Sequence, residues 1–320
     1  MTAIGGFKPA SRRDGALGVH SVGEFVLTVP EVEKAEHFYG AFGLDARANG
    51  DQLSLHTAGD GYRWGRVVPG ARKAMHHLSF HCWEEDLPRF RTHVESCGVK
   101  LLDPPPGFES NGLWFRDMDG TLVEIRVGVK TQPDSRTPMQ LAPTETGIRN
   151  APYRRNASRA VPKRLSHILH FTPDVLGAIR FYERVLGLRL SDRSADLVAF
   201  LHAIHGSDHH VMAFAKSNAP GLHHLSWDVP SLNDIGLGAM AMADKGYDRG
   251  WGFGRHVLGS NYFHYVRDPW GSYCEYSSDM DYVPGTMDWE GREHPPEDGF
   301  FLWGPNPPPD FIHNYEAGPA

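Results

Sequence analysis

The chain is poor in cysteine. Among its 320 residues it has three, Cys82, Cys97 and Cys274, which are widely spaced. An odd number at this spacing forms neither a disulfide framework nor a CxxC metal site. Apolar residues make up 40% of the chain, which is enough for a sizeable core. The sequence therefore predicts a protein of the reducing cytoplasm that is stabilised by its core.

The chain also lacks an excess of positive charge and any long hydrophobic run. Its 39 acidic residues outnumber its 32 basic residues, and the formal net charge is −7. This balance argues against nucleic acid or an anionic membrane as the main partner. No stretch approaches the roughly 18 apolar residues of a membrane span, and residues 1–15 lack the apolar core of a signal peptide. We therefore expect a globular protein that acts on a small molecule.

Three sequence patterns occur twice, which indicates a duplicated chain. The repeated pairs are residues 24–44 and 167–188, 75–80 and 222–227, and 115–125 and 266–276. Within each copy a strand, a helix and further strands are expected twice. The helix of the second copy should begin after Asp174 and end before Gly187. The predicted fold class is α+β, with two domains that each contain two βαβββ modules.

The duplication divides the chain into four parts. Residues 1–130 form the predicted N-terminal domain, and residues 131–163, rich in Pro, Thr and Arg, form a linker. Residues 164–283 form the predicted C-terminal domain. Residues 284–320 are rich in Pro and aromatic residues without a strand or helix pattern, and we interpret them as a tail that wraps over the second domain or a neighbouring subunit.

A predicted metal site lies in the second copy. Asp268–Gly271 has the composition of a turn, so Asn261–Arg267 and Ser272–Ser277 should form an antiparallel hairpin with Glu275 pointing inward. His167 and His224 open equivalent strands of the third and fourth modules. Two histidines and one carboxylate can hold one face of an octahedral metal ion and leave the opposite face open for catalysis.

A purely structural role for these residues is the alternative interpretation. In that case backbone groups would satisfy His223 and His224, and Glu275 would form a salt bridge at a sheet edge. The chain has nineteen histidines, and several, such as His294 and His313, are expected to face solvent. Further polar groups near the carboxylate favour the metal site, because burying them without a use would be costly. They are His209, His210, His256 and Tyr265.

Several of these motifs resemble those of type I extradiol catechol dioxygenases of the vicinal oxygen chelate superfamily. They are Leu165-Ser-His167, Leu222-His-His224, Gly254-Arg-His256, the Tyr265–Gly271 turn and Glu275. The similarity in architecture spans about residues 17–283 and implies a vicinal oxygen chelate, or glyoxalase-like, fold. One departure is His264, where the family usually has an aliphatic residue or Phe. This departure bears on hydrogen bonding around Tyr265.

The resemblance also implies roles for individual residues. His167, His224 and Glu275 would bind the metal, with Fe(II) expected and Mn(II) suited to the same ligands. His210, preferred over His209, would lie beside bound O₂. His256 and Tyr265 would meet the oxygens of the substrate. The matching first-copy positions are Glu24, His77 and Glu124, which we interpret as a lapsed site, with a residual weak metal site as the alternative.

The implied reaction is extradiol cleavage of a catechol by O₂ to a muconic semialdehyde-type product, as in aromatic hydrocarbon catabolism. A metal-dependent glyoxalase-like isomerase or hydrolase, whose ligands would come from both domains, is one alternative. A non-catalytic small-molecule-binding protein is the other. The expected partners are a catechol and O₂, without nucleic acid or membrane, and a homo-oligomer is expected.

The substrate can be narrowed from the residues around the predicted site. Aromatic residues dominate there, and Arg249 is the one plausible anchor for a substrate carboxylate, since Arg255 should point to the opposite face. We therefore expect a catechol with an uncharged alkyl or aryl substituent. The expected apolar lining is Trp251, Phe253, Phe263, Tyr273, Phe300, Phe301, Leu302 and Trp303.

Overall fold

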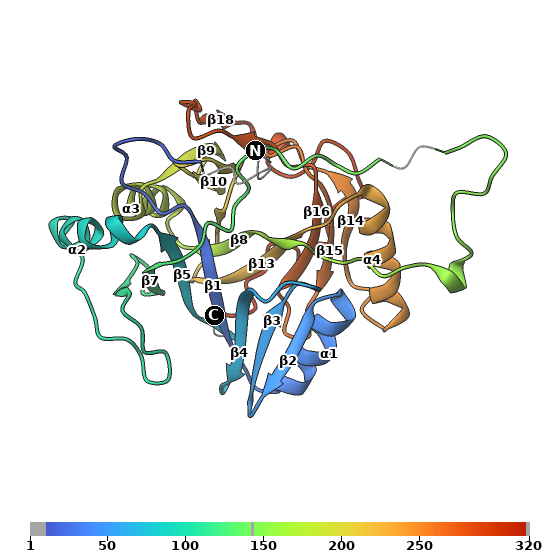
Figure 1. Ribbon diagram of the computed structural model, residues 1–320, viewed down its shortest axis with the longest axis horizontal. Coiled ribbons are helices and arrows are strands. Elements are labelled where there is room, and N and C mark those ends of the chain that lie inside the picture. Colours follow the sequence, from blue (N-terminus) through green and yellow to red (C-terminus); the bar gives the residue numbers. More distant parts are fainter. Residues whose placement is uncertain (1–10, 142–143, 318–320) are drawn as a thin grey trace, which may run out of the picture.

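The computed structural model describes residues 11–141 and 144–317. Its strands form two large mixed sheets and one small two-stranded sheet (Figure 1). No helix in the part of the chain described is long and apolar enough to cross a membrane. The two large sheets correspond to the two copies of the repeat, so the predicted two-part α+β fold is confirmed.

The first sheet has seven strands in the order β2-β3-β4-β1-β5-β7-β6. Helices α1 (Val32–Phe42) and α2 (Leu87–Ser96) follow the two central strands. After α2 one strand of the expected module is reduced to an isolated bridge between Leu102 and Trp114. The strands are β1 (Ser21–Val29), β2 (Asp45–Asn49), β3 (Gln52–His56), β4 (Arg63–Pro69), β5 (Ala74–Cys82), β6 (Leu113–Arg116) and β7 (Leu122–Val127).

The second sheet has nine strands in the order β14-β15-β16-β13-β8-β12-β10-β9-β18. Its helices are α3 (Val175–Leu186) and α4 (Leu232–Asp244). The strands are β8 (Arg164–Thr172), β9 (Leu188–Ser194), β10 (Val198–Ala203), β12 (Met212–Lys216), β13 (Gly221–Asp228), β14 (Gly250–Arg255), β15 (Tyr262–Arg267), β16 (Tyr273–Ser278) and β18 (Arg292–His294). The small sheet pairs β11 (Ser207–Asp208) with β17 (Tyr282–Val283).

The local signals in the sequence act as expected in the second sheet. The side chain of Asp174 accepts a hydrogen bond from the amide of Gly177 at 2.8 Å and so caps α3, which ends at Gly187 with φ 73°. In the β15–β16 hairpin, the carboxylate of Asp268 accepts bonds from two turn amides, and Gly271 has φ 104°. These contacts fix a register in which Tyr265 pairs with Glu275.

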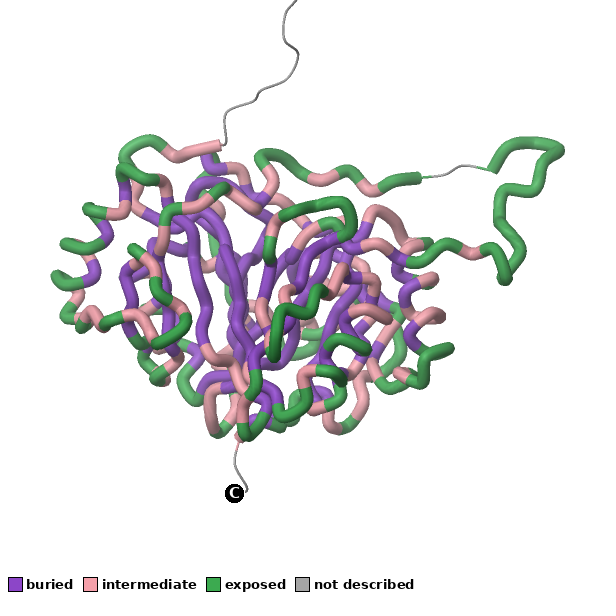
Figure 2. The backbone as a smooth tube through the Cα atoms, turned by 60° about the horizontal axis from the view of Figure 1, so that its bottom comes forward, coloured by how far each residue is buried: buried purple, intermediate pink, exposed green. Residues whose placement is uncertain are grey.

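One hydrophobic core extends through both large sheets. The rings of Phe42 and Tyr276 stack at 3.9 Å, and the Tyr276 hydroxyl donates to the Phe42 carbonyl. Figure 2 shows buried backbone running through the strands of both halves. The described residues between Val127 and Arg164 contain one short 3₁₀ turn (Arg154–Asn156). Thr131 and Gln132 bond to β1 and β8, whereas residues 144–157 extend away from the body of the molecule (Figure 1). The division of the chain at residues 130 and 163 stays a prediction.

Residues 284–317 run over the second sheet. They add β18 beside β9 and form a bridge between Trp303 and Arg255 next to β14, so they touch both edges of that sheet. A short 3₁₀ turn, Pro296–Gly299, lies between these contacts. The expectation that this segment has no strand is therefore wrong for residues 292–294. These three residues form a strand because their backbone pairs with β9, and such pairing leaves no pattern in the sequence from which the strand could be predicted.

Candidate metal centre and active site

Three neighbouring strands bring His167, His224 and Glu275 together. They come from β8, β13 and β16, which lie side by side in the sheet. The Nε2 atoms of the two histidines are 3.0 Å apart, and they lie 3.3 and 3.6 Å from Oε2 of Glu275. All three side chains are buried. This is the one group of its kind within the described ranges.

The surroundings of these atoms fit a divalent metal ion. Oε2 of Glu275 is buried and accepts no hydrogen bond from another described residue, which is costly for a carboxylate unless a cation meets it. Burial by itself raises the pKa of Glu275, but the nearby imidazoles of His167, His256 and His224 lower it well below its usual range. Two imidazoles and a carboxylate suit Fe(II) or Mn(II) equally.

A hydrogen-bonded pair of residues orients His224. The Phe311 carbonyl lies 2.9 Å from Nε2 of His223 and can only accept, so that nitrogen carries the proton. Nδ1 of His223 is then the acceptor for Nδ1–H of His224, at 2.6 Å. This leaves Nε2 of His224 with a free lone pair for a metal. A β-bulge makes the contact possible, because His223 is an extra residue between Leu222 and His224 in the pairing with β8.

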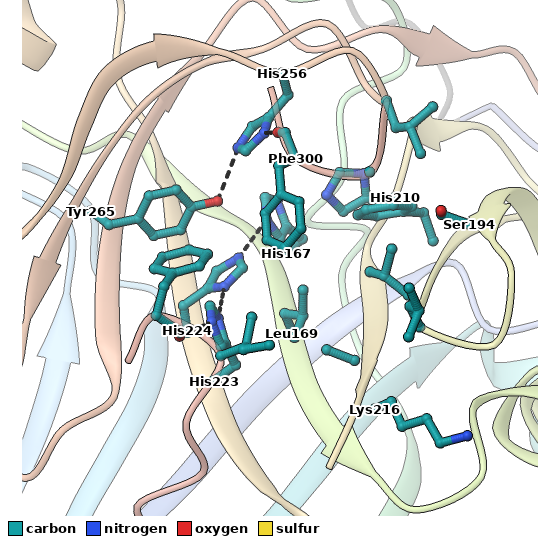
Figure 3. Close-up of a pocket in the computed structure, with 18 of the residues that line it drawn as sticks. His167, Leu169, Ser194, His210, Lys216, His223, His224, His256, Tyr265 and Phe300 are labelled. Atoms are coloured by element: carbon teal, nitrogen blue, oxygen red, sulfur yellow. Dashed lines mark hydrogen bonds between the residues drawn. The ribbon is translucent and has the colours of Figure 1, made fainter. Parts of the chain in front are cut away.

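His256 and Tyr265 form a second pair beside the metal ligands. Nε2 of His256 lies 3.0 Å from the Tyr265 hydroxyl, and its Nδ1 donates to the carbonyl of Phe300. Figure 3 shows this pair on one side of the pocket, above His224. Burial, with the negative charge of Glu275, raises the pKa of Tyr265 well above its usual range. The phenol therefore keeps its proton and can donate it to an acceptor.

His210, not His209, lines the pocket. Its ring lies 4.1 Å from that of His167, whereas Nε2 of His209 points away and bonds to Asp192 at 2.8 Å. Burial and the neighbouring histidines lower the pKa of His210 well below its usual range, so the ring is neutral. The structure therefore groups His210, His256 and Tyr265 around one cavity with His167 and His224 (Figure 3), and the fully buried Glu275 lies beside these two histidines.

The pocket has a volume of about 220 Å³ and is mostly apolar. Its lining differs in part from the one expected. Trp251 and Phe300 line it, but Phe263 and Tyr273 are packed behind it, Phe253 is partly exposed, and Phe301, Leu302 and Trp303 also lie outside the lining. The apolar residues that line it in addition include Leu169, Leu197, Val198, Phe200, Leu258, Phe311 and Ile312.

Arg249 is not a substrate anchor in this structure. It lies in a separate surface depression with Arg267 and Trp270, so the sequence-based assignment is wrong. Glycines flank Arg249 on both sides, so the sequence has no alternation of polar and apolar side chains that would predict which way Arg249 points. The cation that does line the pocket is Lys216, whose ammonium group pairs with Asp196. His264 does not line the pocket and makes no hydrogen bond to Tyr265.

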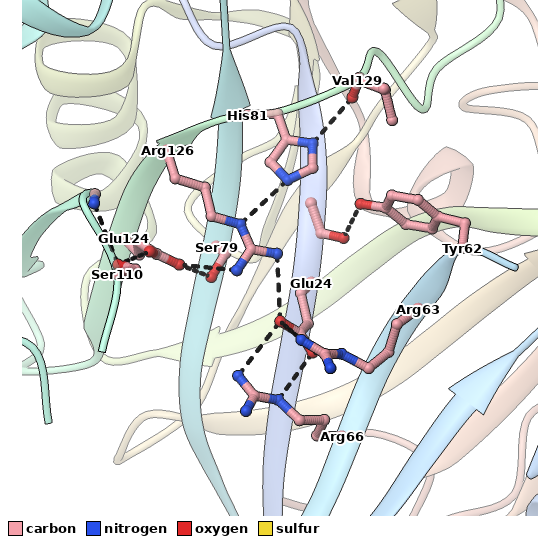
Figure 4. A network of polar contacts seen from close by, with 12 residues as sticks. Glu24, Tyr62, Arg63, Arg66, Ser79, His81, Ser110, Glu124, Arg126 and Val129 are labelled. Atoms are coloured by element: carbon pink, nitrogen blue, oxygen red, sulfur yellow. Dashed lines mark hydrogen bonds and ion pairs between the residues drawn. The ribbon is translucent and has the colours of Figure 1, made fainter. Parts of the chain in front are cut away.

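The equivalent residues of the first sheet form an ion-pair network (Figure 4). Glu24 accepts from Arg63 at 2.7 Å and from Arg66 at 3.0 Å. Arg126 lies between the two acidic residues, 3.3 Å from Glu24 and 3.5 Å from Glu124. His77 is turned toward His76, with their Nδ1 atoms 2.7 Å apart. These residues are not a second metal group, so the alternative of a residual metal site has no support in the described residues.

The chain is similar in sequence to known proteins. Residues 164–276 match the model of the glyoxalase/bleomycin resistance protein/dioxygenase superfamily. The chain is 47% identical over 309 residues to metapyrocatechase 2 of Cupriavidus necator, covering 97% of this chain and 96% of the relative. It is 24% identical over 310 residues to a manganese-dependent 2,3-dihydroxybiphenyl 1,2-dioxygenase of Geobacillus genomosp. 3, covering 90% and 94% of the two chains.

Solved structures show the same fold at low sequence identity. A homoprotocatechuate 2,3-dioxygenase variant from Brevibacterium fuscum superposes with a TM-score of 0.74 at 20% identity, covering 95% of this chain and 83% of that one. The Mn(II)-bound glyoxalase from Novosphingobium aromaticivorans gives 0.73 at 24% identity, covering 94% and 100%. The fold therefore does not separate these two activities, but the metapyrocatechase similarity covers almost the whole of both chains. The chain belongs to the extradiol catechol dioxygenases of the glyoxalase and dioxygenase superfamily.

Proposed function

We propose that this protein is an extradiol dioxygenase that opens the ring of a catechol carrying an uncharged alkyl or aryl substituent. The observation that carries the proposal is the arrangement of the site. Two histidines of the group of two histidines and one glutamate line an apolar pocket, and His210, His256 and Tyr265 line the same pocket. The expected product is of the muconic semialdehyde type.

The metal in this proposal is Fe(II), with Mn(II) as the second candidate. His167, His224 and Glu275 would hold it, and the described residues leave its opposite side facing the pocket. The name of the Geobacillus relative gives manganese, which supports testing both ions. When bound, such an ion brings the catechol oxygens and O₂ together and allows charge to pass between them.

The protein side chains would manage the protons of the reaction. His256 donates through Nδ1 to Phe300, so Nε2 is its accepting nitrogen and lies beside the Tyr265 hydroxyl. This pair can take up the proton of a substrate hydroxyl and hold the resulting oxygen in place. His210 lies on the pocket wall next to His167, where it can stabilise charge on the oxidant side.

The pocket supports an uncharged ring substituent. Leu169, Phe200 and Leu258 line the space beyond the metal ligands, and no arginine of the described chain is among the lining residues. Lys216 lies at the far end from His256 in Figure 3 and is already paired with Asp196. A substrate carboxylate would therefore lose water without gaining a bidentate partner.

A glyoxalase-like activity is the second candidate, because a glyoxalase shares the fold. Such a site was expected to draw ligands from both halves of the chain. Arg63, Arg66 and Arg126 surround Glu24 of the first half, which makes that carboxylate unsuited to a metal. The complete ligand group in the second half favours the dioxygenase. The array of His210, His256 and Tyr265 argues in the same way against a purely binding role.

The proposal is tested by anaerobic reconstitution with Fe(II) or Mn(II), followed by O₂ uptake and the appearance of a yellow product. We expect higher kcat/KM for 3-methylcatechol and 2,3-dihydroxybiphenyl than for 3,4-dihydroxyphenylacetate. An Arg249→Ala variant is the matched control and should keep the kcat/KM of the parent for all three compounds. Failure of every catechol to consume O₂ would disprove the activity, and a clear preference for the acid would disprove the substrate class.

We also propose a cytoplasmic location and a homo-oligomeric state. The three cysteines are free in the structure, which suits a reducing compartment. Leu302 and Trp303 expose 61% and 43% of their surface beside the edge strand β14, where a second subunit could cover them.

A further inference from the structure

Four side chains form a continuous polar chain from the pocket toward the surface. Nδ1 of His210 lies 3.0 Å from Nδ1 of His209, whose Nε2 lies 2.8 Å from Oδ2 of Asp192. Oδ1 of Asp192 lies 2.7 Å from Nε2 of His294 on β18. His209 and His210 are buried, whereas the side chain of His294 is 25% exposed. His294, which was expected to face solvent, is partly buried and bonded to Asp192.

We infer that Asp192 and His294 are positioning residues that present His210 to the pocket as a proton acceptor. A carboxylate only accepts hydrogen bonds, so Nε2 of His209 must carry its proton. Nδ1 of His209 is then an acceptor, and Nδ1 of His210 must donate to it. Since a neutral imidazole carries one proton, Nε2 of His210 is left with a lone pair. That nitrogen makes no hydrogen bond to any other described residue, and His210 lines the pocket.

The state of Asp192 supports this direction of the hydrogen bonds. Burial raises the pKa of Asp192, but the bonds from His209 and His294 lower it to a net value below its usual range, so the carboxylate is charged. The amide of Arg292 donates a further bond to Oδ1 at 3.2 Å. Both this amide and His294 belong to β18, so pairing of β18 with β9 holds the carboxylate in place.

The His209–His210 pair and the His223–His224 pair differ in the group that accepts their last hydrogen bond. The His223–His224 pair ends at a neutral carbonyl, that of Phe311, which fixes the tautomer and carries no charge. The His209–His210 pair ends at a carboxylate. Its negative charge can stabilise a positive charge that develops on the imidazoles, as a buried aspartate does for a catalytic histidine in serine proteases.

This inference rests on the proposed function and specifies that His210 first accepts a proton and later donates it. With its lone pair toward the pocket, His210 enters the reaction as a base. A catechol has two hydroxyl groups, and the His256–Tyr265 pair serves one of them. The O–H bond of the other breaks, an N–H bond forms at Nε2 of His210, and the imidazolium is stabilised by Asp192 through His209. The same proton can be returned to an oxygen atom later in the cycle, which restores the neutral ring. No outside proton is needed between these two steps.

The test uses Asp192→Leu, which removes both acceptor oxygens, and His294→Gln, with Glu293→Gln as the matched control. Glu293 is the neighbour of His294 on β18, and its surface pair with Arg193 lies outside the polar chain. We expect kcat for a catechol to fall by about 10- to 100-fold in Asp192→Leu and less in His294→Gln. Metal content and KM should stay within about twofold of the parent, because no ligand or pocket residue changes.

A direct measurement separates this idea from the proposed activity. In ¹⁵N-histidine-labelled, full-length protein loaded with diamagnetic Zn(II), His210 is identified by the signals that disappear in His210→Phe. The parent should show the proton on Nδ1 of His210. Asp192→Leu should lose this preference, whereas His294→Gln, which keeps the carboxylate but removes one of its donors, should show it less strongly than the parent. A proton on Nε2 in the parent, or an unchanged kcat in a folded, metal-loaded Asp192→Leu variant, would overturn the inference. If Asp192→Leu does not fold, the same two measurements on His294→Gln decide. If no catechol is cleaved, the tautomer result still decides, and the proposed function alone has failed.

Discussion

The two sheets place related residues at equivalent positions and use them differently. In the second sheet His167, His224 and Glu275 converge, and no described residue donates a hydrogen bond to Oε2 of Glu275. In the first sheet the equivalent Glu24 and Glu124 share Arg126, and Glu24 has two further arginines. Both sites need a cation beside buried carboxylate groups. The first sheet supplies it with guanidinium groups, whereas the second requires it from outside.

The difference teaches that the fold alone does not make a metal site. Both copies even keep the same β-bulge, at His76 and at His223, with the two imidazoles of each pair in contact. What differs is the charge near the glutamate. A metal ion cannot compete with an arginine that is covalently part of the chain and already bonded to the same oxygens.

The largest expected effect is the loss of bound metal when a ligand residue of the second sheet is removed. Removal of the equivalent residues of the first sheet should have no such effect. His167→Ala, His224→Ala and Glu275→Ala should bind less than about a tenth of an equivalent of Fe(II) after anaerobic reconstitution and dialysis. Their folds should be preserved, because these side chains are a small part of a large core. Glu124→Ala and His77→Ala should bind the same amount as the parent. A full, tightly held equivalent in Glu275→Ala would show that the ligand assignment is wrong.

A smaller effect, on kcat, is expected from changes to the His256–Tyr265 pair, which has no counterpart in the first sheet. His256→Phe and Tyr265→Phe should keep their metal but lose about 10²- to 10⁴-fold in kcat, because proton transfer is impaired while the ligands remain. Tyr62→Phe is the control in the first sheet, where the hydroxyl donates to the Gly23 carbonyl. Steady-state kinetics with metal analysis measures both, and parent-like rates in the two second-sheet variants would contradict the proposed roles.

The smallest effect concerns stability, and it tests the first sheet directly. Arg126→Met leaves Glu24 and Glu124 without their shared cation and should lower the free energy of unfolding by about 1–3 kcal/mol in urea. Two other arginines still pair with Glu24, which limits the loss. Arg116→Met, which removes an exposed bond to the Gly120 carbonyl, should change little. Metal uptake by the Arg126 variant would mean that the first sheet retains a usable site.

Much of the fold could be predicted because its signals are local. Asp174 and Gly187 define the ends of α3, and the Asp268–Gly271 turn sets the hairpin that carries Tyr265 and Glu275. The duplicated motifs then indicated which strands are equivalent. The grouping of the three ligand residues follows from that equivalence, since central strands of one sheet are neighbours.

The remaining parts of the site could not be predicted because backbone atoms and distant contacts make them. The carbonyls of Phe300 and Phe311 orient His256 and His223, and a carbonyl is present at every residue of a chain. The bond between Asp192 and His294 depends on β18, which has no strand pattern of its own. The prediction for Arg249 was wrong because the path of the chain after α4 turns its side chain into a separate surface depression.

The contacts of residues 292–311 have a consequence for how the protein matures during synthesis. These residues are translated after all the strands that carry the metal ligands, yet they supply partners to His256, His223 and Asp192. While a ribosome still holds them, the ligand side chains can already meet, but His256 and His223 lack the carbonyls that fix their tautomers, and Asp192 lacks its bond from His294. We therefore expect a nascent chain to gather its ligand residues before residues 292–311 complete the hydrogen bonds around them.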